Sequence, residues 1–377
     1  MKKEDLRIIF MGTPEFAVET LKALVENQYN VVAVVTQPDK PVGRHQNEVQ
    51  ASEVKKYALQ QGLPVLQPEK MKDPQFVEQL RSYQANLQVV VAFRMLPEVV
   101  WAMPEYGTFN VHAALLPQYR GAAPINWAVI NGETMTGVTT FFLDHDIDTG
   151  RIIMQLPFAI PDDANVEYVY DGLMHLGAEI CLQTLDRIIA ANGHPESYEQ
   201  LGDESSELRG ESSELRTESS ELRGMISSAN DKLLNESSNH TSHLSSLSSQ
   251  LDKSSSLSSQ PLKPAPKLFK ETCLINWNLP AKKVYDFVRG LSPYPGAWTN
   301  IKMADGKTTV LKVFKTTKTE RQTTGPVGQV IAEKKHLYIA CADRLLEINE
   351  LQLSGKKRMD AQAFLNGMKE FENISVE

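Results

Sequence analysis

Short apolar strands alternate with amphipathic helices from the start of the chain, and this pattern constrains the fold more than any other feature. Residues 6–10 and 31–36 have the length and apolar content of buried strands. Between them, Gly12-Thr13-Pro14-Glu15 leads into a helix that we expect to end near Glu26. Strands that alternate with helices indicate an α/β fold with a Rossmann-like, mostly parallel sheet.

A nicotinamide dinucleotide is not expected on this sheet. The dinucleotide fingerprint needs three glycines after the first strand and an acidic residue after the second. Here Gly12 stands alone, and the second strand ends in Thr36-Gln37.

Two polar side chains mark the carboxyl end of a later strand, which we predict over 107–112. Asn110 and His112 are two residues apart and therefore share one face, while Phe109 and Val111 face the other way. Buried polar groups are costly unless they are satisfied or used, and ligands bind at the carboxyl ends of parallel strands. The pair is a candidate site, although for His112 alone a core histidine satisfied by its neighbours is the usual interpretation.

Composition excludes several classes of protein. The 377 residues suffice for two domains with cores of their own, and no apolar run reaches the roughly 20 residues of a membrane span. The three cysteines are far apart and lack metal-ligand spacing. We therefore expect a cytoplasmic protein with reduced thiols, no metal, no membrane contact and no obligate protein partner.

The charge of the chain divides it into three parts. Residues 1–202 carry 15 Lys and Arg against 25 Asp and Glu, a net −10. Residues 203–262 carry 5 against 10, a net −5, and begin with three copies of Glu-Ser-Ser-Glu-Leu-Arg at a seven-residue period. One leucine per heptad is too thin a stripe for a coiled coil, so we expect a disordered low-complexity linker.

Residues 263–377 carry 19 Lys and Arg against 12 Asp and Glu, a net +7. A helix is predicted over 281–290, followed by strand-like runs at 308–313, 328–331, 337–341 and 345–351, whose spacing fits a small β-barrel. The basic charge is compatible with a bound polyanion, or with lysines that only keep the domain soluble.

Several motifs together resemble the methionyl-tRNA formyltransferase family over essentially the whole chain apart from the repeats. They are Gly12–Ala17, Gln37–Arg44, Phe109–Pro117, Tyr119–Ile125, Asp148–Gly150 and Gly355–Lys357. The resemblance implies a Rossmann-like formyltransferase domain followed by an OB-like barrel. It also implies 10-formyltetrahydrofolate as formyl donor and the methionine amino group of initiator tRNA as acceptor, for translation initiation.

The resemblance assigns catalysis to Asn110, His112 and Asp148. Formyl transfer from N10 of the folate to an amine passes through a tetrahedral, oxyanionic species. Asn110 and a protonated His112 can donate to that oxygen, and Asp148 can pair with His112 and relay a proton through water.

The folate contacts implied by the resemblance fall on two segments. One is Ala114-Leu115-Leu116-Pro117, where Ala114 replaces the serine usual in the family. The other follows the strand at 87–92 and comprises Phe93, Arg94, Met95 and Leu96, one residue shorter than the family pattern and without its glycine.

The tRNA contacts implied by the resemblance are basic. Arg44 and its loop would enter the acceptor end of the tRNA, with Lys270 near it. Lys356, Lys357 and Arg358 would touch phosphates and add salt-dependent affinity.

Two other functions are compatible with parts of the sequence. The same Asn-His-Asp set would serve a folate-dependent formyltransferase that acts on a small amine, such as a nucleotide-sugar or a purine precursor. A non-catalytic tRNA-binding protein descended from such an enzyme is the third possibility, which the intact set argues against.

Overall fold

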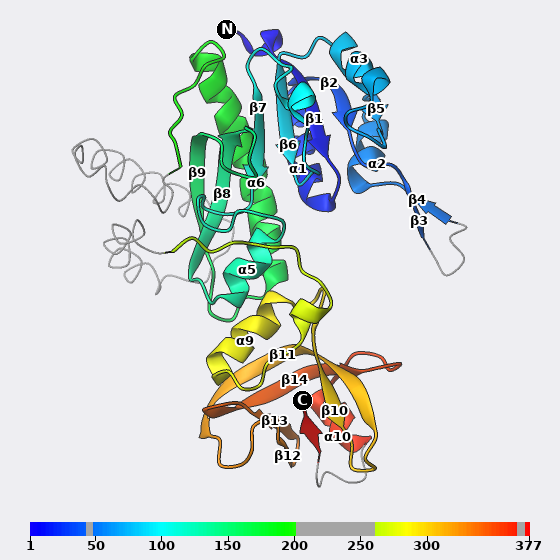
Figure 1. Cartoon of the computed structure of the whole chain (residues 1–377), viewed down its shortest axis with the longest axis vertical. Coiled ribbons are helices and arrows are strands. Elements are labelled where there is room, and N and C mark those ends of the chain that lie inside the picture. The colour runs from blue at the N-terminus through cyan, green and yellow to red at the C-terminus, as the bar shows by residue number, and fades with distance from the viewer. Residues whose placement is uncertain (43–47, 201–260, 368–373) are drawn as a thin grey trace, which may run out of the picture. The chain divides into compact units, whose positions relative to one another are not determined.

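The structure is a computed structural model that describes residues 1–42, 48–200, 261–367 and 374–377 (Figure 1). Its first sheet has seven strands in the order β5-β2-β1-β6-β7-β8-β9. The pairs from β5 to β7 are parallel, whereas β7–β8 and β8–β9 are antiparallel. The strands are β1 (Arg7–Gly12), β2 (Asn30–Val35), β5 (Val65–Leu66), β6 (Leu87–Val91), β7 (Thr108–His112), β8 (Met135–Phe142) and β9 (Ile152–Ala159). The predicted α/β fold with a mostly parallel sheet is confirmed.

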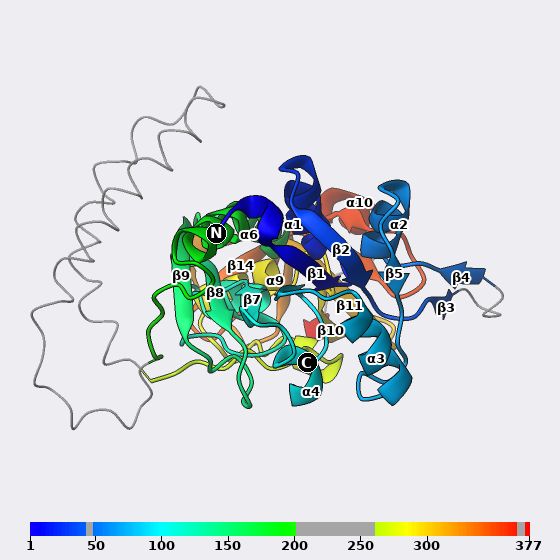
Figure 2. The ribbon, with the colours of Figure 1, turned by 90° about the horizontal axis from the view of Figure 1, so that it is seen from above.

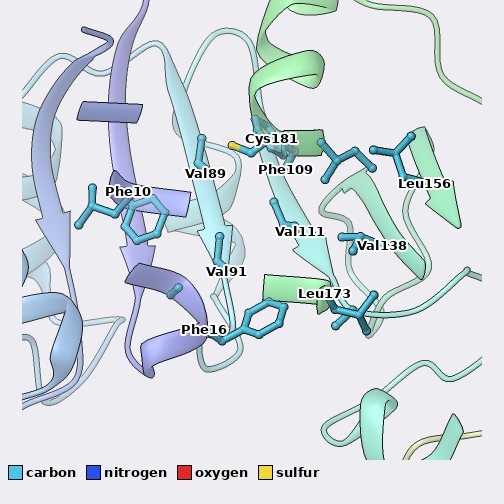
Figure 3. Close-up of a cluster of buried hydrophobic side chains, with 14 of the residues drawn as sticks. Phe10, Phe16, Val89, Val91, Phe109, Val111, Val138, Leu156, Leu173 and Cys181 are labelled. Atoms are coloured by element: carbon cyan, nitrogen blue, oxygen red, sulfur yellow. The ribbon is translucent and has the colours of Figure 1, made fainter. Parts of the chain in front are cut away.

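Helices cover both faces of this sheet, as Figure 2 shows from above. They are α1 (Glu15–Glu26), α2 (Glu53–Gln60), α3 (Pro74–Ser82), α4 (Glu98–Trp101), α5 (Pro124–Ile130) and α6 (Val166–Ala190). Helices α1, α2, α5 and α6 share a core with Phe109 and Val111 of β7, which Figure 3 shows beside Val89 and Val91 of β6. Helices α3 and α4 pack on the opposite face. Phe109 and Val111 therefore point into one core, and the alternation of the strand turns Asn110 and His112 to the other face.

Gly12 is required by packing rather than by a phosphate. A Cβ at this position would lie 2.7 Å from Cβ of Ala17 and 3.2 Å from the carbonyl oxygen of Val91. The glycine thus lets the end of β1 approach the first turn of α1 and the end of β6.

The C-terminal residues form an antiparallel sheet in the order β12-β13-β14-β11-β10-β16. Its strands are β10 (Ala297–Lys302), β11 (Thr308–Gln322), β12 (Val330–Glu333), β13 (His336–Ala340), β14 (Arg344–Leu353), β15 (Met359–Asp360) and β16 (Ser375–Val376), with helices α9 (Ala281–Gly290) and α10 (Ala361–Asn366). An isolated bridge between Gln329 and Ser375 joins the two ends of this order. The sheet therefore closes nearly into the predicted barrel.

Helix α9 is anchored to residues of the first sheet's helices and loops. Arg289 donates from Nη1 to the carbonyl oxygen of Ala164 at 2.8 Å and from Nε to Asp286 at 2.8 Å. Both charged side chains are almost fully buried, at 7% and 2% exposure. Asn126 of α5 donates to the carbonyl oxygen of Gly290 at 2.8 Å. Residues 1–199 and 264–377 accordingly form one compact unit.

Several sequence predictions were incomplete. Helix α5 was not expected, although Pro124 occupies a position typical of a first helical turn. Strand β11 is much longer than the predicted 308–313, because bulges allow it to continue beside β14. Arg44 and most of the 203–262 tract lie outside the described residues, so the predictions for them stay predictions. The short strands β3 (Lys40–Val42) and β4 (Glu48–Gln50) flank the position of Arg44.

Candidate active site

His112 ends β7 with its ring held between two oxygen atoms. Its Nε2 lies 2.9 Å from the carbonyl oxygen of Tyr119, and its Nδ1 lies 3.8 Å from Oδ2 of Asp148. A carbonyl oxygen can only accept, so Nε2 carries the hydrogen and donates to Tyr119. In the neutral ring, the lone pair is then on Nδ1 and faces the carboxylate. The ring is 6% exposed, so this orientation is fixed inside the protein.

Asp148 reaches His112 from the loop between β8 and β9. Leu143 donates to the carbonyl oxygen of Thr108 at the amino end of β7, so the loop must run along the strand to bring Asp148 to its carboxyl end. Asp144 shapes this loop by accepting from the hydroxyl of Thr149 at 2.7 Å and from the amide of Asp146 at 3.2 Å.

The loop also packs against α4. The ring of His145 lies edge-on to that of Trp101, with centroids 5.4 Å apart, and its Nδ1 lies 4.0 Å from Oε2 of Glu98. Asp144 and His145 thus shape the loop through contacts within the protein.

The segment Tyr119–Gly121 supplies backbone partners to both residues. Tyr119 accepts from His112, while the amide of Gly121 donates to Oδ2 of Asp148 at 2.9 Å. Tyr119 is buried with a φ of 61°, and its hydroxyl donates to Glu133 at 2.5 Å. Burial and this bond raise the pKa of Tyr119 well above its ordinary range. The sequence shows this segment only as a motif, because its positioning role depends on contacts that form in the folded protein.

Asn110 lies on the same face of β7 as His112 and carries an unused polar atom. Its Oδ1 is buried and has no hydrogen-bond partner among the residues that the structure describes. Rotation of the amide would exchange Oδ1 and Nδ2, so a donor can equally occupy this place. An unsatisfied buried amide is costly, and a bound ligand would relieve that cost.

Side chains of β8 and β9 hold the first predicted folate segment through its backbone groups. The hydroxyl of Thr139 donates to the carbonyl oxygen of Ala114 at 2.6 Å and accepts from the amide of Leu116 at 3.1 Å. Gln155 donates to the carbonyl oxygen of Leu116 at 2.9 Å. Ala114 and Leu116 are buried, whereas Leu115 and Pro117 are half-buried. Any contact with a ligand from this segment would come mainly through Leu115 and Pro117.

The second predicted folate segment follows β6. Arg94 donates to the backbone carbonyl oxygens of Glu69, at 2.9 Å, and of Pro68, and burial lowers the pKa of its guanidinium. This side chain fixes the segment rather than presenting a charge to a ligand. Met95 is 72% exposed, and Leu96 is buried. A pocket of about 390 Å³ is lined by Lys70, Met71, Lys72, Met95, Leu96 and Pro97.

Four of the five predicted tRNA-binding residues lie in the part of the chain that the structure describes. Lys356 and Lys357 are exposed on the turn after β14, which Gly355 forms with a φ of 75°. Arg358 donates from Nε to Glu350 at 2.8 Å and lies 4.4 Å above the ring centre of Phe314. Its charge is therefore partly balanced within the barrel.

A row of side chains, which we call the basic row, connects Lys356, Lys357 and Arg358 with Lys270. The ammonium of Lys270 lies 5.4 Å from the ring centre of Trp298, whose Nε1 donates to the carbonyl oxygen of Lys270 at 2.8 Å. Trp298 pairs with Lys312 and Lys312 with Gln352, and directly opposed residues share a face of a sheet. Gln352 in turn donates to the carbonyl oxygen of Lys356 at 2.8 Å. Lys312 was not among the predicted residues, because only strand pairing brings it into this row.

The chain matches formyl transferases in sequence and in fold. Residues 6–185 match the family model described as "Formyl transferase", and residues 267–369 match "Formyl transferase, C-terminal domain". HypX from Aquifex aeolicus, solved in complex with tetrahydrofolic acid, has a similar fold, with a TM-score of 0.54 and 16% identity. That similarity covers 96% of this chain and 47% of HypX.

Two curated relatives show which formyl transferases this chain is similar to over its full length. The methionyl-tRNA formyltransferase of Parabacteroides distasonis is 48% identical over 377 residues, covering 100% of both chains. The methionyl-tRNA formyltransferase of Bacteroides thetaiotaomicron is 48% identical over 370 residues, covering 98% of both. The chain belongs to the methionyl-tRNA formyltransferase family.

Within the described residues, no helix is long and apolar enough to cross a membrane, and no group of three or more His, Cys, Asp or Glu side chains could hold a metal ion. Cys181, Cys273 and Cys341 are buried and free.

Proposed function

We propose that this protein transfers the formyl group of 10-formyltetrahydrofolate to the amino group of methionine on initiator methionyl-tRNA, in the cytoplasm and for translation initiation. The single observation that carries this proposal is the arrangement of His112 between Tyr119 and Asp148, in a chain of this family. No protein partner is required by this function.

The protonation states follow from the geometry. Because Nε2 of His112 is committed to Tyr119, Nδ1 is the nitrogen that can take up and return a proton. The 3.8 Å between Nδ1 and Asp148 is too long for a direct hydrogen bond and suits an ion pair or a bridging water. We assign to this pair the proton that leaves the attacking amine and later reaches N10 of the folate.

Asn110 is assigned to the developing oxyanion. Its amide atom without a partner, buried on the same strand face as His112, supports this role. A donor aimed at an oxyanion in a buried site contributes about 3–4 kcal/mol to the transition state.

The folate is assigned to the segments 93–96 and 114–117, through backbone atoms and the partly exposed side chains of Phe93, Met95, Leu115 and Pro117. The tRNA is assigned to Arg44 and to the basic row that ends in Lys270 and Lys356–Arg358. A surface that combines lysines with an aromatic ring is suited to phosphates and to a nucleic-acid sugar or base.

Labelled formyl transfer tests this proposal with the purified protein. Formyl-labelled 10-formyltetrahydrofolate is mixed with methionyl initiator tRNA, free methionine or an amino sugar nucleotide. We expect label on the methionyl-tRNA alone. Label on the amino sugar alone would identify a small-amine formyltransferase instead, and tRNA binding without transfer of label to any acceptor would indicate a non-catalytic binder.

A further inference from the structure

Just after the low-complexity tract, the chain passes beside residues 119–123, which we call the active-site loop, and contacts them through Ala265. Ala265 is fully buried within the core of the first sheet, although it lies between Pro264 and Pro266, which are both exposed. A residue so far along the sequence is not needed to complete the core of a sheet that ends before residue 200. Its burial therefore calls for a specific role.

Backbone hydrogen bonds pair Ala265 with the loop that holds the catalytic pair. The amide of Ala265 donates to the carbonyl oxygen of Arg120 at 2.8 Å. Its carbonyl oxygen accepts from the amides of Ala122, at 2.8 Å, and Ala123, at 3.1 Å. Gly121 and Ala265 form an isolated parallel bridge. The bonds lie between the Tyr119 carbonyl that orients His112 and the first turn of α5.

The contact is too close for a side chain at position 121. A Cβ on Gly121 would lie 2.5 Å from the carbonyl oxygen of Ala265, and the φ of Gly121 is +126°. Tyr119 also has a positive φ, of 61°. Such conformations persist only where neighbouring groups enforce them. The bonds to Ala265 supply that constraint, and the indole of Trp127 adds to it by donating to the carbonyl oxygen of Pro266 at 2.8 Å.

We propose that Ala265 is a positioning residue for formyl transfer, an inference that rests on the function proposed above. Its backbone holds residues 119–123 in the conformation that places the Tyr119 carbonyl on His112 and the Gly121 amide on Asp148. The segment between the low-complexity tract and the barrel thus helps to hold the active site in place. It also links the loop directly to Lys270 and the basic row.

The test is Ala265→Pro, which removes the amide hydrogen that bonds Arg120 and keeps an apolar side chain. We expect kcat for methionyl-tRNA formylation to fall by about 10- to 100-fold, because small displacements of reacting groups cost about this much. The KM values for folate and tRNA should stay within about threefold. Ala265→Gly keeps both backbone groups and should restore most of kcat.

The order of the two variants separates positioning from packing. If Ala265 only filled the core, glycine would be at least as damaging as proline, and that order would overturn the proposal. If Ala265→Pro does not fold, Trp127→Phe replaces it: this change removes the bond to Pro266 and the pyrrole part of the indole, and keeps an aromatic ring in the packing. We then expect a several-fold loss of kcat with KM unchanged, and wild-type kcat in this folded variant would overturn the proposal. A wild-type enzyme that transfers no formyl group would instead refute the proposed function.

Discussion

Thr139 offers a sharp test of how the predicted folate segment is held. Its side chain is fully buried, and its hydroxyl serves three groups. It donates to the carbonyl oxygen of Ala114 and accepts from the amide of Leu116 and from Nε2 of Gln155. Thr139→Val keeps the shape of the side chain and removes all three bonds, so the effect is polar rather than a cavity.

The expected cost follows from the groups that lose their bond. Gln155 keeps its bond to the carbonyl oxygen of Leu116, whereas Ala114 and Leu116 each lose the partner of a buried backbone group. A stranded buried group costs about 1–3 kcal/mol, so Thr139→Val should lower the free energy of unfolding by about 2–6 kcal/mol. The KM for 10-formyltetrahydrofolate should rise, because the 114–117 segment is no longer fixed.

Thr140→Val is the matched control. Thr140 is the next residue of β8 and equally buried, but among the described residues its hydroxyl bonds only the hydroxyl of Thr184, at 2.8 Å, on the opposite face. Only one hydroxyl is stranded, so we expect about half the loss of stability of Thr139→Val and an unchanged KM for the folate. Urea denaturation and steady-state kinetics measure both quantities. Equal destabilisation by the two variants, or an unchanged KM in Thr139→Val, would refute this reasoning.

Four further predictions concern the site and the stability of the unit. His112→Ala and Asp148→Ala should abolish formyl transfer, and Asn110→Ala should lower kcat by about 10²- to 10³-fold. All three variants should still bind tRNA in a filter-binding assay. Wild-type-like turnover would contradict the roles assigned. Lys356→Ala should reduce the slope of log tRNA affinity against log salt concentration by about one phosphate contact. Lys335→Ala, on the exposed turn between β12 and β13, should leave this slope unchanged. The same slope in both variants would argue against tRNA binding by the basic row. Arg289→Ala should destabilise the protein by about 3 kcal/mol or more, because the buried Asp286 then keeps only the more exposed Lys282 of its two cationic partners. Lys318→Ala breaks a more exposed pair with Asp162 and should cost about 0–1 kcal/mol. Similar losses of unfolding free energy in a denaturant titration would show that burial does not set the cost. Deletion of residues 204–260 should leave kcat and KM near wild type, because loop length contributes little free energy; a large loss of activity would show that the tract binds or docks.

Much of the fold could be predicted because it depends on local pattern. The sequence directly shows the apolar runs of β1, β2 and β6 and the helical periodicity of α6. It also shows that Asn110 and His112 share one strand face. The long β11 and the missed α5 could not be read in this way, because bulged pairing with β14 and packing against α9 stabilise them. Within the site, Gly121 is visible in the sequence, but the reason for it is not.

The sequence by itself determined which chemical groups are present and roughly where each strand presents them. It placed Asn110 and His112 on one strand face, which follows from the period of two along a strand, whereas Asp148 was assigned through the family resemblance. Tertiary structure alone decided which nitrogen of His112 faces Asp148, because that depends on the carbonyl oxygen of Tyr119 in space. It also decided that Ala265, more than 140 residues further along the chain, supports the same loop. Backbone hydrogen bonds between distant segments leave no periodic trace in a sequence, and only folding brings their partners together.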